Sequence, residues 1–259
     1  MKISLLLPTL GERDYELERL LNSLIEQEYK DFEVIIISQA NHDKVKEIVH
    51  TFNQLSIIHD CLYSQSGLSL ARNRGLELCS GDIIMLSDDD CWYPRESLST
   101  ILQEFKINPQ LDVLLTQIFD YDQNILYKKY SKEESRIINK YNLMSRSSIE
   151  IAFKRRTCNK RFDEEFGLGA KYKCGEEADF LLSLFSATKE YRYVPKITVY
   201  HPRKNNVYNK ERIIAKGALY SKHFNIAISH IVLLRDLLVK KQNNYYHFFK
   251  GFKSYKKKF

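Results

Sequence analysis

Short apolar segments alternate with amphipathic segments through residues 2–116. Residues 32–38, FEVIIIS, are nearly all apolar or β-branched, a pattern typical of a strand buried on both faces of a parallel sheet. The predicted strands are 2–8, 32–38, 55–60, 82–87 and 111–116, and the predicted helices between them are 13–28, 43–53, 68–79 and 95–107. This alternation predicts an α/β fold, Rossmann-like, with a doubly wound and mostly parallel sheet that binds ligands at the carboxyl ends of its strands.

The second half of the chain has a different rhythm. Residues 117–160 are irregular and rich in tyrosine and lysine, with a predicted strand at 148–154, and a glycine-punctuated loop then leads into a helix near Glu176. A strand over 191–200 is followed by amphipathic C-terminal helices near 208–224 and 226–240. We therefore divide the chain into a first half (1–117), a second half of the same domain (118–205) and C-terminal helices with a tail (206–259).

The charge is concentrated at one end. The chain carries a net charge of +7, and residues 240–259 alone hold seven lysines and no acid, so the remainder is about neutral. A nucleic-acid-binding protein needs a basic stripe on its folded body, so we expect no nucleic-acid partner. The tail also holds seven aromatic residues, which favours contact with an anionic membrane surface, although a solubilising tail is the alternative.

Cysteines and the N-terminus indicate the compartment. Five cysteines form no CxxC pair, which argues for reduced thiols in a cytosolic protein. The apolar run that ends at Pro8 is too short for a signal peptide or a membrane span. We therefore expect a cytoplasmic protein.

Three consecutive aspartates, 88–90, follow the strand predicted at 82–87. Carboxylates this close repel one another, so a structural role is a poor explanation, and a divalent cation with phosphates beyond it is a better one. Mg²⁺ and Mn²⁺ prefer oxygen ligands and use one or two carboxylates together with substrate phosphates. The alternative is an acidic cluster at the start of the next helix.

Five ordered blocks, covering about residues 2–203, resemble the inverting family-2 glycosyltransferases of the GT-A fold. They are ISLLLPTLGER, FEVIIIS, GLSLARNRGLELCSGDIIMLSDDDCWYP, GLGAKYKCGEEADFLL and ITVYHP. The resemblance implies transfer of a sugar from a nucleotide-sugar donor, with Mn²⁺ or Mg²⁺ on the diphosphate. It makes 1–117 the donor-binding half and 118–205 the acceptor and catalytic half.

The resemblance also implies roles for individual residues. Asp90 is the expected direct metal ligand, with Asp88 and His201 as further ligands and Asp89 beside the donor. His201 has a structural role as its alternative, and Arg203 would neutralise the departing diphosphate. The general base is expected at Glu177, with Glu176 and Asp179 as the other candidates and helix N-terminal charge as the alternative.

Nucleotide recognition departs from the family pattern, because Ser38 and Gln39 stand where an Asp-Asp pair is usual. A glutamine amide can complement the imide edge of uracil or thymine, so both bases stay open. Blocks that the family uses around the nucleotide contribute three more candidates, Thr9, Glu12 and Arg72. Arg72 has a buried scaffold role as its alternative.

The sequence thus predicts a metal-dependent inverting glycosyltransferase, peripheral on the inner face of the membrane, that extends a polysaccharide or a lipid-linked glycan. A sugar-phosphate nucleotidyltransferase is the first alternative, but LPTLGERD (residues 7–14) is not the glycine-rich phosphate loop with a basic residue that is expected of one near the first strand. A non-catalytic scaffold for glycan assembly is the second. The donor sugar, the acceptor, the linkage and the oligomeric state stay open.

Overall fold

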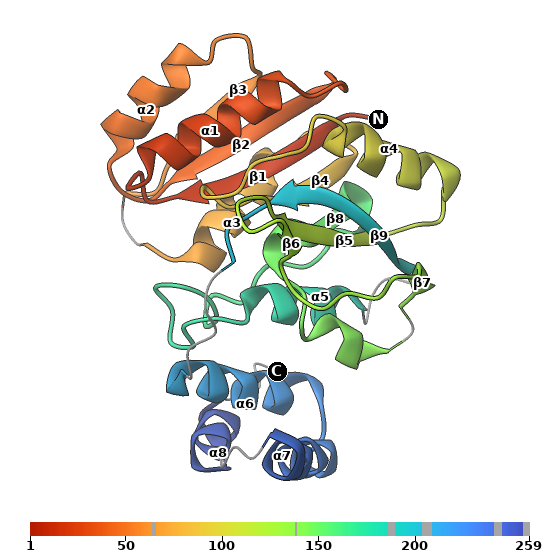
Figure 1. Ribbon diagram of the computed structural model, residues 1–259. Helices are drawn as coiled ribbons and strands as arrows, with labels where there is room; N and C mark the ends of the chain where they lie inside the picture. The colour runs from red at the N-terminus through yellow and green to blue at the C-terminus, as the bar shows by residue number, and fades with distance from the viewer. Residues whose placement is uncertain (64–65, 138, 186–189, 204–208, 241–244, 256–259) are drawn as a thin grey trace.

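The computed structural model describes all residues except 64–65, 138, 186–189, 204–208, 241–244 and 256–259 (Figure 1). The strands are β1 (Ile3–Thr9), β2 (Phe32–Ser38), β3 (Ile57–Cys61), β4 (Ile83–Leu86), β5 (Val113–Asp120), β6 (Ile125–Leu126), β7 (Ser135–Arg136), β8 (Ile151–Lys154) and β9 (Tyr191–Tyr200). The helices are α1 (Asp14–Ile25), α2 (His42–Thr51), α3 (Leu68–Leu78), α4 (Ser97–Ile107), α5 (Glu176–Phe185), α6 (Lys210–His223), α7 (Ile226–Lys240) and α8 (Tyr245–Ser254). Short 3₁₀ turns are η1 (Lys140–Leu143), η2 (Ser148–Glu150) and η3 (Arg155–Thr157).

One mixed sheet organises the molecule, with strand order β3-β2-β1-β4-β8-β5-β9-β7 and β6 paired to β5. The pairs β2–β3, β1–β2, β1–β4 and β5–β9 are parallel, which confirms the predicted α/β class. Strand β8 lies antiparallel between β4 and β5. The strand predicted at 148–154 is therefore shorter than expected, because residues 148–150 form η2.

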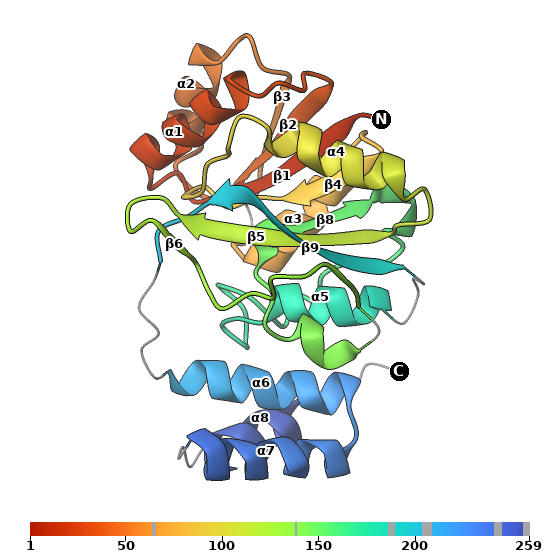
Figure 2. The ribbon, with the colours of Figure 1, turned by 45° about the vertical axis from the view of Figure 1, so that its right-hand side comes forward.

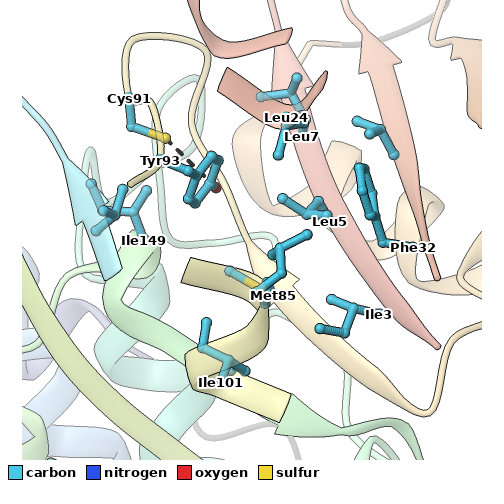
Figure 3. Packing of buried hydrophobic residues seen from close by; sticks show 14 of the residues in the cluster. Ile3, Leu5, Leu7, Leu24, Phe32, Met85, Cys91, Tyr93, Ile101 and Ile149 are labelled. Carbon is cyan, nitrogen blue, oxygen red and sulfur yellow. Dashed lines mark hydrogen bonds between the residues drawn. The ribbon is translucent and has the colours of Figure 1, made fainter. Parts of the chain in front are cut away.

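Both faces of the sheet are covered, which is why its first strands are continuously apolar. Leu5 and Leu7 of β1 and Met85 of β4 belong to one buried cluster with Leu24 of α1 and Ile101 of α4 (Figure 3). The intervening residues of β1 and β2 belong to a second cluster with residues of α3 and α5 on the opposite face. The architecture is thus three layers, with the carboxyl ends of β1, β2 and β4 meeting at one edge.

The segment after β4 is anchored on both sides of the three aspartates. Cys91 and Tyr93 are buried, and the Tyr93 hydroxyl donates a hydrogen bond to Ser87 Oγ at 2.7 Å. The Cys91 thiol lies 3.7 Å from the Tyr93 hydroxyl (Figure 3). Because Ser87, Cys91 and Tyr93 are buried, the backbone that carries the three aspartates is fixed on both sides.

The C-terminal helices form a further layer beneath α5 (Figures 1 and 2). Helices α6 and α8 touch at two glycines: a Cβ added at Gly217 would meet the Phe248 carbonyl oxygen at 1.9 Å, and one at Gly251 would meet the Ile214 carbonyl oxygen at 1.9 Å. The Tyr255 hydroxyl, just beyond α8, donates to Asp163 Oδ2 at 2.9 Å. Residues 245–254 of the predicted basic-aromatic tail therefore form a helix that is docked on the rest of the protein.

The predicted membrane segment, residues 240–259, is partly buried in the protein. Within it, Phe248 and Tyr255 are buried in the protein, whereas Tyr245 and Tyr246 are exposed. Residues 241–244 and 256–259, which carry four of its lysines, lie outside the described residues. None of the helices in the described part of the chain has the length and apolar content needed to cross a bilayer.

Candidate functional site

A cleft of about 290 Å³ opens at the carboxyl ends of β1, β2 and β4. Its lining includes six residues that the sequence singled out, Thr9, Glu12, Gln39, Asp88, Asp89 and Asp90. Residues 66–68, at the start of α3, and residues 168–169 complete the lining. The topology of the sheet thus brings the predicted metal site and much of the predicted nucleotide site into one cavity.

The carboxylates of Asp89 and Asp90 are held by the loop that follows β1. The Thr9 hydroxyl donates to Asp89 Oδ2 at 2.7 Å, and Nη1 of Arg13 lies 2.9 Å from both Asp89 Oδ1 and Asp90 Oδ2. Burial raises the pKa of Asp89, opposed by the hydrogen bond from Thr9 and the charge of Arg13. In this structure the Arg13 guanidinium supplies positive charge to the adjacent carboxylates of Asp89 and Asp90.

Arg13 is a site residue that the sequence argument missed. Arg13 belongs to the segment LPTLGERD and lines the cleft, although the sequence analysis assigned it no role. The available signal was its position in the loop after the first strand, at the sheet edge where ligands bind.

Arg72 lies behind the cleft with its side chain fully buried. Its Nη2 donates to Asp88 Oδ1 at 2.9 Å and its Nη1 donates to Glu176 Oε1 at 3.0 Å. The Ser148 hydroxyl donates to the other oxygen of Asp88 at 3.1 Å. Arg72 therefore fixes the first aspartate and the start of α5 relative to each other, and it does not line the cleft.

His201 reaches the aspartates because the end of β9 pairs with the segment after β4. The backbone N–H of Trp92 donates to the Tyr200 carbonyl at 3.1 Å, and the Tyr200 N–H donates back at 2.7 Å. This bridge brings Nε2 of the buried His201 to 3.1 Å from Asp90 Oδ1.

The hydrogen bond on the other side of the ring decides what this pair can hold. His201 Nδ1 lies 2.6 Å from the Pro202 carbonyl oxygen, which can only accept, so Nδ1 carries a proton. In the neutral ring Nε2 then presents a lone pair to the Asp90 carboxylate, and two facing acceptors need a proton or a metal ion between them. A neutral imidazole beside a carboxylate suits Mn²⁺.

The donor set is small, and this fits a metal that shares its ligands with substrate. No group of three or more His, Cys, Asp or Glu side chains among the described residues is arranged to hold a metal ion. Mg²⁺ and Mn²⁺ bound to nucleotides commonly take only one or two protein carboxylates and complete their shell with phosphate oxygens and water. Asp90 and His201 meet that requirement.

The three acids at the start of α5 have different surroundings. Asp179 is buried, 2.8 Å from Lys222 Nζ and 2.7 Å from His223 Nε2, so it ties α5 to α6. That placement corrects its candidacy as a general base. The Glu176 carboxylate forms an ion pair with Arg72. Burial, together with the adjacent Glu176 carboxylate, raises the pKa of the partly exposed Glu177 to about 8.

One other predicted residue, Ser38, lies differently from expectation. The Ser38 side chain is fully buried, with its Oγ 2.7 Å from His42 Nδ1 and 2.8 Å from His59 Nε2. Ser38 therefore supports the end of β2, which corrects its assignment as a nucleotide contact.

Gln39 does line the cleft, and its Oε1 accepts a hydrogen bond from the Gly67 N–H at 2.7 Å. Arg203 is exposed, and its backbone N–H donates to Asp120 Oδ2.

Comparison with known proteins gives a family match over most of the first 164 residues. Residues 4–164 match the family described as "Glycosyl transferase family 2". The chain is 28% identical over 201 residues, 73% of its length and 62% of the relative's, to the GalNAc(5)-diNAcBac-PP-undecaprenol beta-1,3-glucosyltransferase of Campylobacter jejuni. It is 26% identical to an uncharacterized glycosyltransferase of Haemophilus influenzae, over 98% of its own length and 92% of the relative's.

The chain covers only part of several relatives and shares its fold with solved structures. The chain spans less than two thirds of several curated relatives, including only 18% of the glycosyltransferase GlyA of Streptococcus pneumoniae. Among solved structures, Staphylococcus aureus TarS 1-349 in complex with UDP-GlcNAc has a TM-score of 0.71 at 18% identity, covering 93% of this chain and 74% of that one. The mannosyltransferase PcManGT of Pyrobaculum calidifontis, in complex with GDP-Man and Mn²⁺, has a TM-score of 0.62 at 17% identity, covering 88% and 64%. These likenesses establish the GT-A fold.

The substitution Arg72→Met tests the buried ion pairs. Removing the guanidinium leaves the Glu176 carboxylate buried and unpaired, so the free energy of unfolding should fall by about 3–5 kcal/mol. Denaturant unfolding monitored by circular dichroism measures this loss. Arg74→Gln is the matched control on the same helix, because Arg74 pairs only at the surface, and its cost should stay within about 1 kcal/mol. Equal stabilities of the two variants would contradict the role of Arg72.

Proposed function

This chain belongs to glycosyl transferase family 2, and we propose that it is a metal-dependent inverting glycosyltransferase. In this proposal it moves a sugar from a UDP- or dTDP-sugar to a growing polysaccharide or lipid-linked glycan. The observation that carries the proposal is the Asp90–His201 pair, in which His201 Nε2 lies 3.1 Å from Oδ1 of the cleft-lining Asp90. Residues 1–117 would hold the donor, and residues 118–205 would supply the acceptor side and the base.

On the donor side, Asp90 and His201 would hold Mn²⁺ or Mg²⁺. The ion, when bound, neutralises negative charge on the diphosphate and so makes the nucleotide a better leaving group. Thr9 and Arg13 orient the carboxylates of Asp89 and Asp90. Asp89 and Glu12, which line the cleft, would contact the ribose. Gln39, which lines the cleft, would contact the base, and Arg203, which follows β9, would neutralise the diphosphate.

On the acceptor side, Glu177 would act as the general base. The acceptor oxygen forms a bond to the anomeric carbon, the bond from that carbon to the diphosphate oxygen breaks, and the hydroxyl proton passes to Glu177. The raised pKa of Glu177 suits this task, because a base poised near neutral pH takes a proton effectively. Arg72 couples the two sides, since it contacts both Asp88 and the residue that precedes Glu177.

We also propose that the C-terminal layer rests on an anionic membrane at the inner face. Exposed apolar side chains on α7 and α8 support this, namely Ile231, Leu234, Tyr245 and Tyr246. Lys250 and Lys253 of α8 are exposed beside them. Deletion of the whole segment would be a poor test, because it would also remove the buried Phe248 and Tyr255.

Donor binding should depend on the metal and on Asp90. We expect Asp90→Asn to weaken Mn²⁺-dependent UDP binding by about 10-fold or more, because it removes the charged ligand while keeping its shape. Isothermal titration with UDP and dTDP, with Mn²⁺ and then with EDTA, measures this. Asp43→Asn, an exposed acid on α2, is the control and should bind as the wild type does. UDP and dTDP affinities that are indifferent to EDTA would refute the metal assignment.

The rate of transfer should report the protonation of Glu177. Since the base must be deprotonated, kcat/KM for the acceptor should rise with pH through about 8 and level off above it. Glu177→Gln should lower turnover by about 10²–10⁴-fold and abolish this pH dependence while donor affinity is retained. Glu211→Gln, an exposed acid of α6, serves as control. A larger loss in Glu176→Gln, with the pH limb intact in Glu177→Gln, would move the base to Glu176.

Membrane contact should depend on the lysines of α8. Replacing Lys250 and Lys253 by glutamine should reduce co-flotation with phosphatidylglycerol vesicles, since each surface lysine contributes about 1 kcal/mol at low salt. Neutral vesicles and a Lys106→Gln variant, altered on the distant α4, are the controls (Figure 1). Equal flotation of all variants would leave α8 with a role in packing alone.

A further inference from the structure

A second cavity, of about 460 Å³, lies between the start of α5 and the C-terminal helices. Glu177 and Gly175 form its wall on the α5 side, and residues of α6 and α7 form the wall opposite. It is separate from the donor cleft, yet Arg72 joins the two, because it contacts Asp88 in the cleft and Glu176 next to this cavity. An acceptor that is to react at Glu177 has to pass through or beside this space.

The described residues that line this cavity carry more positive than negative charge. Arg212 and Lys216 come from α6 and Arg235 comes from α7, while Glu177 is the acid among its described lining residues. Arg212 and Lys216 are four residues apart, so they lie on the same face of α6. Three cations from two helices therefore converge on one cavity, an arrangement that suits an anionic ligand.

Aromatic side chains stand beside the cations. Tyr141 and Tyr220 line the same cavity. Tyr141 is 41% exposed, and its ring stacks on Phe224 with centroids 5.1 Å apart, so it is held in place while one face stays accessible. Rigid aromatic surfaces with nearby polar groups are suited to sugar rings. Arginine guanidinium groups bind phosphate oxygens in a bidentate manner.

We propose that the cavity lined by Arg212, Lys216 and Arg235 binds a phosphate group of the acceptor, and that the acceptor is therefore a phosphate-bearing glycan. The proposal rests on the proposed function, since it takes Glu177 as the base. Both a polyol phosphate chain and a lipid diphosphate carry this group close to a sugar. The cations would hold the phosphate while the attacking hydroxyl lies at Glu177.

The position of the cations favours an acceptor over a bilayer headgroup. They line a cavity whose opposite wall is the start of α5, whereas the exposed apolar residues of α7 and α8 lie outside it. A planar membrane surface meets the outer face of the helices and not the space between them and α5 (Figure 2).

Binding of two soluble probes to the full chain tests the proposal. Glycerol 3-phosphate represents a polyol phosphate and farnesyl diphosphate a lipid diphosphate, each titrated with UDP and Mn²⁺ present so that the donor cleft is filled. Arg212→Gln, Lys216→Gln and Arg235→Gln should each weaken binding of at least one probe by about 10-fold, because each removes a charge-assisted hydrogen bond. Lys210→Gln, on α6 outside the cavity, should bind as the wild type does, and Arg212→Lys should retain part of the affinity.

The outcomes separate this proposal from the proposed function. Loss for glycerol 3-phosphate alone identifies a polyol phosphate acceptor, and loss for farnesyl diphosphate alone identifies a lipid-linked one. Donor hydrolysis and UDP affinity should not change in these variants, since none of the three residues lines the donor cleft. Unchanged binding of both probes, or loss confined to phosphatidylglycerol vesicles, overturns the phosphate site. A wild-type protein that neither binds UDP nor hydrolyses any nucleotide sugar would instead refute the proposed function.

Discussion

The site depends on one fully buried guanidinium. Arg72 has lost its water, and it can remain charged because the carboxylates of Asp88 and Glu176 take up two of its amino groups. The same contacts bind the loop after β4 to the first turn of α5. A buried cation with two fixed anions tolerates little displacement of either, so the proposed donor and acceptor sides are held in one geometry. Burial of these charges costs free energy of folding, but the resulting ion pairs hold the Asp88 and Glu176 carboxylates in fixed positions.

Next to Arg72, the fold holds the three adjacent carboxylates of residues 88–90, which carry like charges, in fixed positions. Backbone on both sides of the triplet is anchored, through Tyr93 to Ser87 and through Trp92 to Tyr200. The side chains can then differ in environment although they are adjacent in sequence: Asp88 faces Arg72, and Asp90 faces His201. Sequence neighbours thus gain separate roles because each is met by a different element of the fold.

How much of this could be predicted follows from the range of the interactions. Buried strands and the position of Asp90 at a strand's carboxyl end are local patterns, and the structure has strand 32–38 with the predicted bounds. Insertion of β8 between β4 and β5 depends on pairing between distant segments, which periodicity does not encode. Ser38 and Asp179 look like site residues by position, but their partners are histidines and a lysine brought in by tertiary packing. The sequence did not predict helix 245–254, because its aromatic residues are equally compatible with packing in the protein and with contact with a membrane.

The contacts that assemble the site span long stretches of chain, and this has a consequence for folding. Thr9 and Asp89 are 80 residues apart, Arg72 and Glu176 are 104 apart, and Asp90 and His201 are 111 apart. Each pair closes a long loop, and the entropy of that closure is recovered only when the sheet between the partners has formed. We therefore expect these side chains to come together late in folding, when the topology of the sheet is complete.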